Sequence, residues 1–519
     1  MTPSYYKHIR LCSLILCILS SNLYAGGMVI HMFQSEKAIA QLNDSDLKQL
    51  LNQNTNALYS GTQYPDAGYS PGFLGQEKHV WGEASHWAPF IVTYLEVVIE
   101  KCQGRYLSDS ECGKLASHFL GAAAHGIQDQ VFDGLFIPKV TEVDHKGQET
   151  TDIGIDMVAL REHSRDHTIP KPWYTPADVL VEVYRRMNYS EHEANRSQIL
   201  TATKVSETGR YGESLIAPFL YWHYKKLMPW GSRNYMTYPG GVEYGGRITA
   251  NFWKHLWKKL NGVNDTGAPN ITTIPASGEQ HVSINKRDTD NKISVTFDRY
   301  IIPSSVNNTS FQVTDAQGNQ IFGSIGLFAY SGQTHAEANM IQFKPYGSLE
   351  FNTIYTVSMN ASILDEDGAS IFGNNGYQWQ FTTEKSEQYQ QLNSQGFCLG
   401  LPKYEPSSTS IDVELQTCTE TRHQHWYQDT NNQWHNRSRP DLCLDVDGDR
   451  ARSWRRIKAN TCNDKSLQQW QYDSDLNRLS LLNDNYAMGT FLNAWAGIEL
   501  RLFRPRNNSR QQWASTLTD

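Results

Sequence analysis

Beyond its first 25 residues, the 519-residue sequence contains no apolar run long enough to form a transmembrane helix. Charged residues are scarce at 19%, whereas 14 Trp and 27 Tyr make aromatic residues plentiful, a balance common in secreted proteins that bind glycans or lipids. Basic residues are also in short supply, with 46 Lys and Arg against 54 Asp and Glu. Without an excess of positive charge, general nucleic-acid binding is not expected.

The first 25 residues have the pattern of a signal peptide. A basic region precedes the apolar stretch Leu11–Leu19, which is too short to span a bilayer, and Leu23-Tyr24-Ala25 is an acceptable cleavage box. Cleavage after Ala25 removes two basic residues and leaves 44 basic and 54 acidic ones, a formal charge of -10. A short membrane anchor is the alternative, but Gly26-Gly27 directly after the box favours cleavage. We therefore expect a secreted protein, either periplasmic or extracellular.

Cysteine is rare, with eight residues in the chain, and cleavage would remove Cys12 and Cys17. The remaining six are an even number, which indicates disulfide bonds in an exported protein. Sequential pairing is the simplest scheme. It predicts the pairs Cys102–Cys112, Cys398–Cys418 and Cys443–Cys462.

Sequence periodicity divides the mature chain into three regions. Residues 26–265 contain repeated apolar runs at helical spacing, which predict an all-α domain. After a linker at 261–270, residues 271–385 alternate with a period of two between turn residues, as in a β-sandwich. Residues 386–519 contain an internal repeat, because Gln-x-Trp recurs every 43 or 44 residues. The sequence therefore predicts a multidomain protein with a helical domain followed by β domains.

Several residues in the helical region are of the types that bind metals. His125 and Asp129 are four residues apart, so on a helix they project from one face, and Asp133 continues that stripe. Asp152 and Asp156 form a second pair with the same spacing. A histidine and a carboxylate on one helix face can build an internal metal site in a bundle. Taken alone, each pair is equally compatible with a solvated surface.

Two further candidates lie in loops or at helix ends. Asp66 follows Tyr-Pro and could cap a helix, and His86 lies in Ser-His-Trp and could be a hydrogen-bonded core histidine. The aromatic residues Tyr64, Trp81 and Trp87 either line a pocket near these residues or pack in the core. No single motif of this region decides between a metal site and ordinary structure.

The order and spacing of three tracts are more specific. LYSGTQYPDAGY, HVWGEASHWAPF and FLGAAAHGIQD resemble the zinc-dependent phospholipase C superfamily, most closely the catalytic domain of glycosylphosphatidylinositol-specific phospholipase D. The resemblance covers about residues 26–265 and is most specific over 58–133. It implies an all-helical domain with a trinuclear metal centre, in which Asp129 bridges two ions. The metal ligands implied by the resemblance are Gly26 through its free α-amino group and carbonyl, His31, Asp66, His86, His125, Asp129, Asp133, Asp152 and Asp156.

The third metal position departs from the family. Asp133 stands where the family has a histidine, and Asp152 and Asp156 stand where bacterial members have a His/Glu pair. Imidazole suits zinc, whereas a site of carboxylates alone also suits magnesium, calcium or manganese. We therefore expect two or three bound ions, of which two are Zn²⁺ and the identity of the third is open. Asp66 is expected to orient or deprotonate the attacking water.

The two β regions resemble known modules. Residues 271–385 are similar to Ig-like domains of bacterial surface proteins, and 386–519 are similar to ricin-type β-trefoil lectins, whose intra-repeat bridges match two of the predicted disulfides. The lectin resemblance implies a sugar-binding Asp445, but Gly400 and Met488 replace that aspartate in the other repeats, and Asn460 replaces the expected aromatic residue. The domain either binds glycans or has kept only the trefoil core.

The leading functional hypothesis is a secreted zinc metallophospholipase of the phospholipase C type, which acts on phospholipid at a membrane surface. Phospholipase D-type cleavage of glycosylphosphatidylinositol or phospholipids is the first alternative. A zinc nuclease would share the fold, but Gly26 and the aspartates of the third site argue against it. A non-enzymatic glycan-binding adhesin is the remaining alternative.

Overall fold

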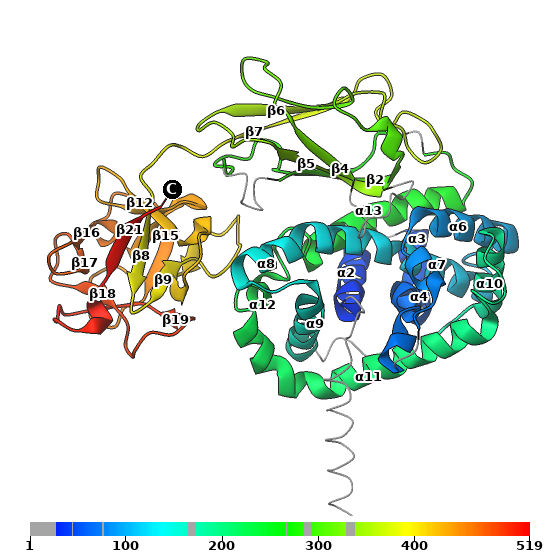
Figure 1. Ribbon diagram of the computed structural model, residues 1–519, viewed down its shortest axis with the longest axis horizontal. Coiled ribbons are helices and arrows are strands. Elements are labelled where there is room, and N and C mark those ends of the chain that lie inside the picture. Colours follow the sequence, from blue (N-terminus) through cyan, green and yellow to red (C-terminus); the bar gives the residue numbers. More distant parts are fainter. Residues whose placement is uncertain are drawn as a thin grey trace, which may run out of the picture.

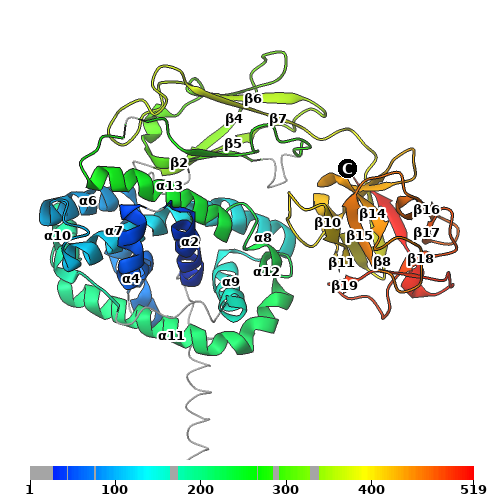
Figure 2. The ribbon, with the colours of Figure 1, turned by 180° about the vertical axis from the view of Figure 1, so that it is seen from behind.

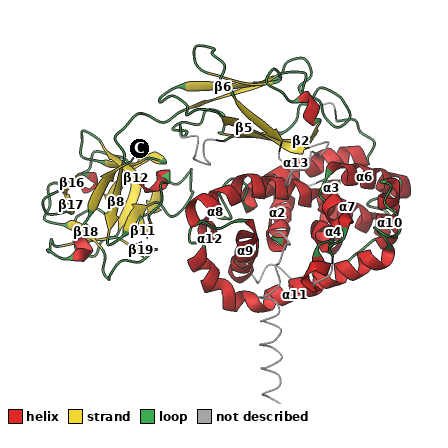
Figure 3. Ribbon diagram, viewed as in Figure 1, coloured by secondary structure: helices red, strands yellow, loops and turns green. Residues whose placement is uncertain are grey.

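The computed structural model describes residues 27–43, 45–74, 77–163, 173–265, 267–284, 292–327 and 338–518, so the predicted signal peptide and Gly26 lie outside the described residues. The chain forms a helical domain, a β-sandwich that lies along one side of it, and a β-trefoil beside both (Figure 1). Helices and strands are separated along the chain, as the periodicity predicted (Figure 3). Within the described ranges, no helix is both long and apolar enough to cross a membrane.

The helical domain is an α-bundle whose boundaries follow local sequence signals. Helix α6 begins at Ala88 with Pro89 in its first turn, where a proline needs no N–H donor. The side chain of Asp109 accepts hydrogen bonds at the start of α7, and Asn195 forms a capping box at the start of α11. The elements are α2 (Met28–Gln41), α3 (Asp46–Gln53), α4 (Thr55–Ala67), the 3-10 helix η1 (Ser70–Leu74), α5 (Val80–Ala84), α6 (Ala88–Cys102), α7 (Ser110–Val131), the π-helical η2 (Phe132–Phe136), α8 (Ile137–Asp144), α9 (Gln148–His163), α10 (Ala177–Arg186), α11 (Arg196–Leu227), α12 (Gly231–Asn234) and α13 (Val242–Leu260).

Helices α4 and α7 approach each other unusually closely. A Cβ atom at Gly61 would lie 2.0 Å from the carbonyl oxygen of His118, and one at Gly121 would lie 2.1 Å from that of Leu58. Only glycine fits at both positions. The contact fixes the end of α4, which carries Asp66, against the middle of α7, which carries His125.

The β-sandwich consists of two antiparallel sheets that pack on the helical domain. One sheet has the strand order β1 (Ile271–Ile274), β2 (Ile293–Ile301), β5 (Ala338–Pro345), β4 (Gly323–Leu327), and the other has β3 (Phe311–Thr314), β6 (Ile354–Met359), β7 (Tyr377–Thr382). Strand β2 lies against α13, where the rings of Phe252 and Tyr300 are 5.3 Å apart. At the same interface, His255 and Lys259 contact Glu366 at 2.9 and 2.8 Å.

The third domain repeats one structural unit three times. The indole N–H groups of Trp426, Trp470 and Trp513 are buried and donate to the carbonyls of Leu399, Leu444 and Met488 at 3.0, 2.9 and 3.1 Å. Its strands are β8 (Gln390–Ser394), β9 (Phe397–Gly400), β10 (Ser410–Asp412), β11 (Glu414–Thr417), β12 (His425–Gln428), β13 (Trp434–Asn436), β14 (Arg439–Val446), β15 (Ile457–Thr461), β16 (Trp470–Asp473), β17 (Arg478–Leu481), β18 (Ala487–Gly489), β19 (Ile498–Glu499), β20 (Arg501–Phe503) and β21 (Ala514–Leu517). All three predicted disulfides are present: Cys102–Cys112, Cys398–Cys418 and Cys443–Cys462.

The trefoil contacts both other domains. Arg437 pairs with Glu384, which follows the last strand of the sandwich, at 2.9 Å. On the other side, the backbone N–H of Tyr404 donates to Asn234 of α12 at 2.6 Å. Seen from behind, the trefoil again lies at the α12 end of the helical domain (Figure 2). A cleft of about 1020 Å³ lies where the three domains meet.

Candidate metal centre

Three histidines from distant parts of the chain converge inside the helical domain. His31 comes from α2, His86 follows α5, and His125 comes from α7. The rings of His31 and His125 are 4.1 Å apart, and those of His86 and His125 are 4.7 Å apart. All three side chains are buried.

Two aspartates complete two potential metal-binding groups. His31, His125 and Asp129 form one group, and Asp66, His86 and His125 form the other, with the ligand atoms of each group within 4.8 Å of one another. His125 therefore belongs to both. Asp129 also links them, because its Oδ1 lies 3.0 Å from Nε2 of His31 and its Oδ2 lies 3.3 Å from Nε2 of His125.

In each histidine, a hydrogen bond at Nδ1 fixes the ring, and with it the direction in which the second nitrogen, Nε2, points. Nδ1 of His125 donates to the Thr62 carbonyl at 2.7 Å, and Nδ1 of His86 donates to the Gly82 carbonyl at 2.8 Å. Nδ1 of His31 lies 3.1 Å from Oε1 of Gln128. These acceptors leave the three Nε2 atoms directed towards the aspartates, the arrangement by which proteins orient histidine ligands.

The electrostatics of the centre fit a bound cation. Because Nδ1 of His125 carries a proton, and burial lowers the pKa of this histidine, its Nε2 presents a lone pair to Oδ2 of Asp129. Two acceptors then face each other without a proton between them. Nε2 of His125 and Oδ2 of Asp66 are both buried and have no hydrogen-bond partner among the described residues. A divalent cation would satisfy the nitrogen, and Oδ2 of Asp66 stays available as an acceptor.

Against the effect of burial, the same carboxylates raise the pKa values of the other two histidines, His86 and His31. Burial opposes the charge of His86, but Asp66 and Asp129 outweigh it and raise its pKa to about 9. Burial likewise opposes the charge of His31, whose pKa is nevertheless raised by Asp129. The concentration of negative charge is therefore strong enough to hold protons on buried imidazoles, and metal ions would compete for the same positions.

The three aspartates predicted for a third metal site do not belong to either of the two histidine-containing groups found among the described residues. Asp133 lies in η2 and accepts a hydrogen bond from Gln148 at 2.7 Å. Asp156 accepts from the backbone N–H groups of Val29 and Ile30 at 2.9 and 3.2 Å, so it caps the start of α2. Burial raises the pKa values of Asp133, Asp152 and Asp156, and neighbouring carboxylates add to the effect. Their role as ligands stays a prediction.

The aromatic residues near the site belong mainly to the core. Tyr64 and Trp81 are fully buried and stack with their rings 5.3 Å apart, and Trp87 is also buried. Tyr69 was not singled out from the sequence, yet its ring lies 5.5 Å from that of His86 and its hydroxyl donates to Glu83 at 2.5 Å. Tyr69 therefore contacts a candidate metal ligand directly.

Sequence reasoning also missed Arg210 and Glu213 on the inner face of α11. Arg210 is fully buried, and none of its guanidinium nitrogens has a hydrogen-bond partner among the described residues. Its nearest carboxylate is Glu213 at 3.7 Å, and burial raises the pKa of Glu213 to about 7. The charge of Arg210 also acts on Asp156, against the effect of burial. A charged residue inside a long helix resembles a surface residue in sequence, so no local signal marked it.

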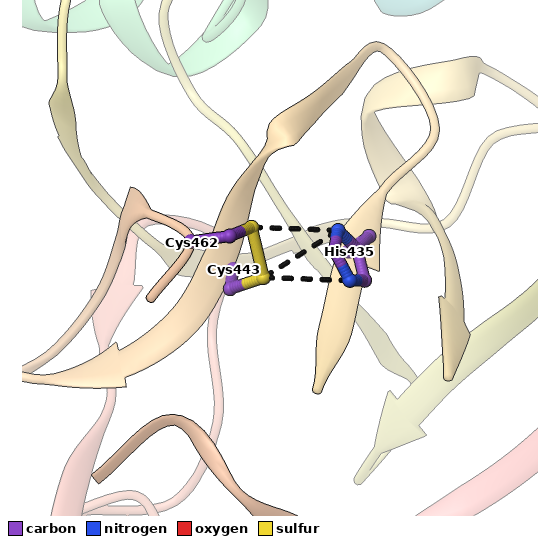
Figure 4. Close-up of side chains that lie close together, drawn as sticks. All are labelled: His435, Cys443 and Cys462. Carbon is purple, nitrogen blue, oxygen red and sulfur yellow. Dashed lines mark hydrogen bonds between the residues drawn. A yellow bond between two sulfur atoms is a disulfide. The ribbon is translucent and has the colours of Figure 1, made fainter. Parts of the chain in front are cut away.

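The trefoil contains a third cluster of metal-binding residue types. His435 lies against both sulfurs of the Cys443–Cys462 disulfide, with Nδ1 3.4 Å from each (Figure 4). Sulfurs joined in a disulfide are not thiolates, which are the metal-binding form of cysteine. This cluster is therefore structural while the disulfide is intact.

The predicted sugar contact Asp445 is engaged inside the domain. Its Oδ2 accepts hydrogen bonds from Asn460 and Gln468 at 3.0 and 2.9 Å, and the residue is buried. These bonds stabilise the second repeat. A role in sugar binding stays a prediction.

Comparisons with known proteins agree with this architecture. Residues 265–383 match the model of the bacterial Ig-like domain, and residues 369–470 and 390–513 match that of the ricin-type β-trefoil lectin domain. A C-terminal half of an earthworm R-type lectin in complex with GalNAc is 13% identical and covers 25% of this chain and 99% of its own, with a TM-score of 0.23. The β-trefoil lectin of the Vibrio vulnificus hemolysin/cytolysin is 18% identical over 26% of this chain and 98% of its own, with a TM-score of 0.21.

Curated relatives point to a family of phospholipases. Phosphatidylinositol-glycan-specific phospholipase D of Rattus norvegicus is 24% identical over 290 residues, 52% of this chain and 34% of that protein. The Homo sapiens protein is 24% identical over 293 residues, with the same coverage. The chain thus spans about a third of the length of these relatives. Over half its length the chain is therefore similar to phosphatidylinositol-glycan-specific phospholipases D, and it also contains a bacterial Ig-like domain and a ricin-type β-trefoil lectin domain.

Proposed function

We propose that the protein is a secreted zinc metallophospholipase that hydrolyses the phosphodiester of phospholipid head groups. The observation that carries the proposal is the pair of histidine and aspartate groups that share His125. The similarity to phospholipases D supports the substrate class. The six paired cysteines are in keeping with an oxidising compartment and hence with export.

Two metal ions would be held by the five residues that make up these groups, which are His31, Asp66, His86, His125 and Asp129. Nitrogen and carboxylate donors of this kind suit zinc. When bound, the ions would supply positive charge that neutralises the phosphodiester and acidifies water. The aspartates Asp133, Asp152 and Asp156 remain candidates for a third ion whose identity is open.

Protein side chains would carry out the remaining tasks. The unpartnered Oδ2 of Asp66 would accept a proton from the attacking water and fix its orientation. The guanidinium of Arg210 would pair with a phosphate oxygen, because a buried Arg without a hydrogen-bond partner in the described chain is well suited to a charge-assisted bidentate contact.

The side of the phosphate that is cleaved separates two forms of the proposal. The bacterial-type Ig-like domain favours phospholipase C cleavage, which releases diacylglycerol. The relatives, in contrast, are phospholipases D, and this type of cleavage of glycosylphosphatidylinositol or phospholipids would leave phosphatidic acid. Incubation of the mature protein with labelled phosphatidylcholine, followed by product identification, distinguishes the two.

A matched pair of histidine variants tests the metal centre. His125→Ala should abolish hydrolysis and bound metal, whereas His118→Ala removes a buried histidine of the same helix that contacts Tyr94 at 3.0 Å, outside both groups. His118→Ala should retain both metal and activity. Chelation should stop the reaction of the wild type and added zinc should restore it. Equal activity in the two variants would contradict the proposal.

Two other functions have distinct outcomes in the same preparation. Fewer than two bound metals per chain, together with glycan binding, would favour an adhesin. Chelator-sensitive digestion of single-stranded DNA would favour a nuclease. The ricin-type domain supports glycans as a second partner, and a glycan array with the full chain tests that part separately.

A further inference from the structure

Helix α11 has an apolar stripe on its outer face. Tyr211, Leu215, Phe219 and Trp222 follow one another at intervals of four, four and three residues, so they lie along one side of the helix. Their exposed fractions are 47%, 55%, 82% and 74%. The stripe is about 16 Å long at 1.5 Å per residue. Large side chains exposed side by side in this way mark an interaction surface.

The fully exposed positions of α11 include no acidic residue. Lys226 is exposed after the stripe, and Lys204, before the stripe, is exposed and pairs with the partly buried Glu207 at 2.6 Å. The whole chain, in contrast, has a net charge of -8. Aromatic side chains with flanking lysines match the boundary between the acyl chains and the phosphates of a bilayer.

Among the described residues, neither β domain covers this face of α11. The helix runs along the edge of the helical domain opposite the β-sandwich, and the trefoil lies beside the domain rather than over α11 (Figures 1 and 2). On its inner face, the same turns carry Arg210 and Glu213, and α11 packs against α9, which carries Asp152 and Asp156. One helix diameter, about 10 Å, thus separates the stripe from the side of α11 that carries Arg210 and Glu213.

From these observations, we propose that the stripe Tyr211, Leu215, Phe219 and Trp222 is the surface by which the protein docks on a phospholipid bilayer. This proposal rests on the phospholipase function, since a lipid substrate has to be reached within a membrane. Docking through α11 would place the candidate centre next to the head groups and the sandwich on the side away from the bilayer.

The experiment compares two pairs of exposed aromatic residues. Phe219→Gln with Trp222→Gln removes the centre of the stripe. Phe322→Gln with Tyr346→Gln is the matched control, because these neighbours on the sandwich are 66% and 68% exposed. Flotation with phosphatidylcholine vesicles, with and without phosphatidylglycerol, measures binding. Hydrolysis of a short-chain phosphatidylcholine below its critical micelle concentration measures the catalytic centre.

We expect the stripe variant to bind vesicles at least tenfold more weakly than wild type. It should hydrolyse the monomeric lipid at the wild-type rate. The control variant should match wild type in vesicle binding and in hydrolysis. Unchanged vesicle binding by the stripe variant, or an equal loss in the control, would overturn the proposal. If wild type does not bind vesicles but forms a dimer, and the stripe variant is a monomer, the stripe is instead a contact with a second copy of the chain, and the proposal fails. If wild type binds vesicles through the stripe but hydrolyses neither lipid, the docking surface stands and the phospholipase function fails.

Discussion

The hydrogen bond between Gln128 and His31 offers a test of how the metal centre is held. Gln128 is buried on α7, and its Nε2 donates to Ser35 and Thr249 at 3.0 and 3.1 Å. These two bonds point Oε1 at Nδ1 of His31. In Gln128→Met, a side chain of similar size would remove the acceptor and leave the histidine free to rotate or change tautomer.

The expected loss follows from the general effect of such supporting contacts. Removing the partner of a ligating histidine lowers metal affinity or activity about 10- to 100-fold, which corresponds to about 1.4–2.7 kcal/mol. The same substitution also leaves buried polar groups unpaired, at about 1–3 kcal/mol of folding stability. A loss of stability alone would therefore not identify the role of Gln128.

Gln130 supplies the matched control on the same helix. It is also buried, but its Oε1 accepts from the backbone N–H of Asn339 in the sandwich at 3.0 Å. Gln130→Met should lower stability by a similar amount and leave metal affinity at the wild-type value. Competition with a zinc indicator measures affinity, and thermal unfolding measures stability. Wild-type affinity in Gln128→Met, or an equal fall in both variants, would refute the reasoning.

Three further perturbations test other parts of the structure. Arg210→Met should reduce hydrolysis about 100-fold, the order found when a group that stabilises developing charge is removed. Its effect on thermal stability should be small, because loss of the 3.7 Å pair with Glu213 is offset by removal of a buried charge that has no hydrogen-bond partner in the described chain; a stability loss parallel to the activity loss would make Arg210 structural. Gly126→Ala would bring a Cβ atom to 2.2 Å from the His86 carbonyl oxygen and should lower metal content, whereas Gly212→Ala, which meets nothing within 4 Å, should not; equal metal content in both contradicts this. Burial opposes the ionisation of Glu366, but its cationic neighbours on α13 lower its pKa to about 2 from 4.5. The folded state therefore gains about 3 kcal/mol from this group above pH 4.5 and loses it as the pH falls towards 2. Glu366→Gln should flatten the pH dependence of the unfolding midpoint in that window, and an unchanged slope would argue against it.

Local patterns predicted most elements of the fold because each pattern is a property of a short segment. The alternation in residues 292–297 and 354–359 predicts strands that the structure contains as β2 and β6, and the Gln-x-Trp repeat predicts the threefold trefoil. Proline is favoured in the first turn of a helix, and α6 begins at Ala88 with Pro89 in that turn.

The centre was predicted only in part, since its geometry depends on contacts between distant segments. The spacing of His125 and Asp129 gives one helix face, but no local pattern shows that His31 meets them. The capping of α2 by Asp156 joins residues 127 positions apart. The amide of Gln128 is oriented by two other helices, and in sequence it is an ordinary polar residue.

The three domains form a closed ring of contacts. The helical domain meets the sandwich at Glu366, the sandwich meets the trefoil through Glu384 and Arg437, and the trefoil returns to the helical domain through Tyr404 and Asn234. A swing of any one domain about its linker would have to break two of these junctions at once. The three junctions therefore tie the domains to one another, so that a glycan held by the trefoil, as proposed above, would set the height and tilt of the helical domain over the surface that carries the glycan.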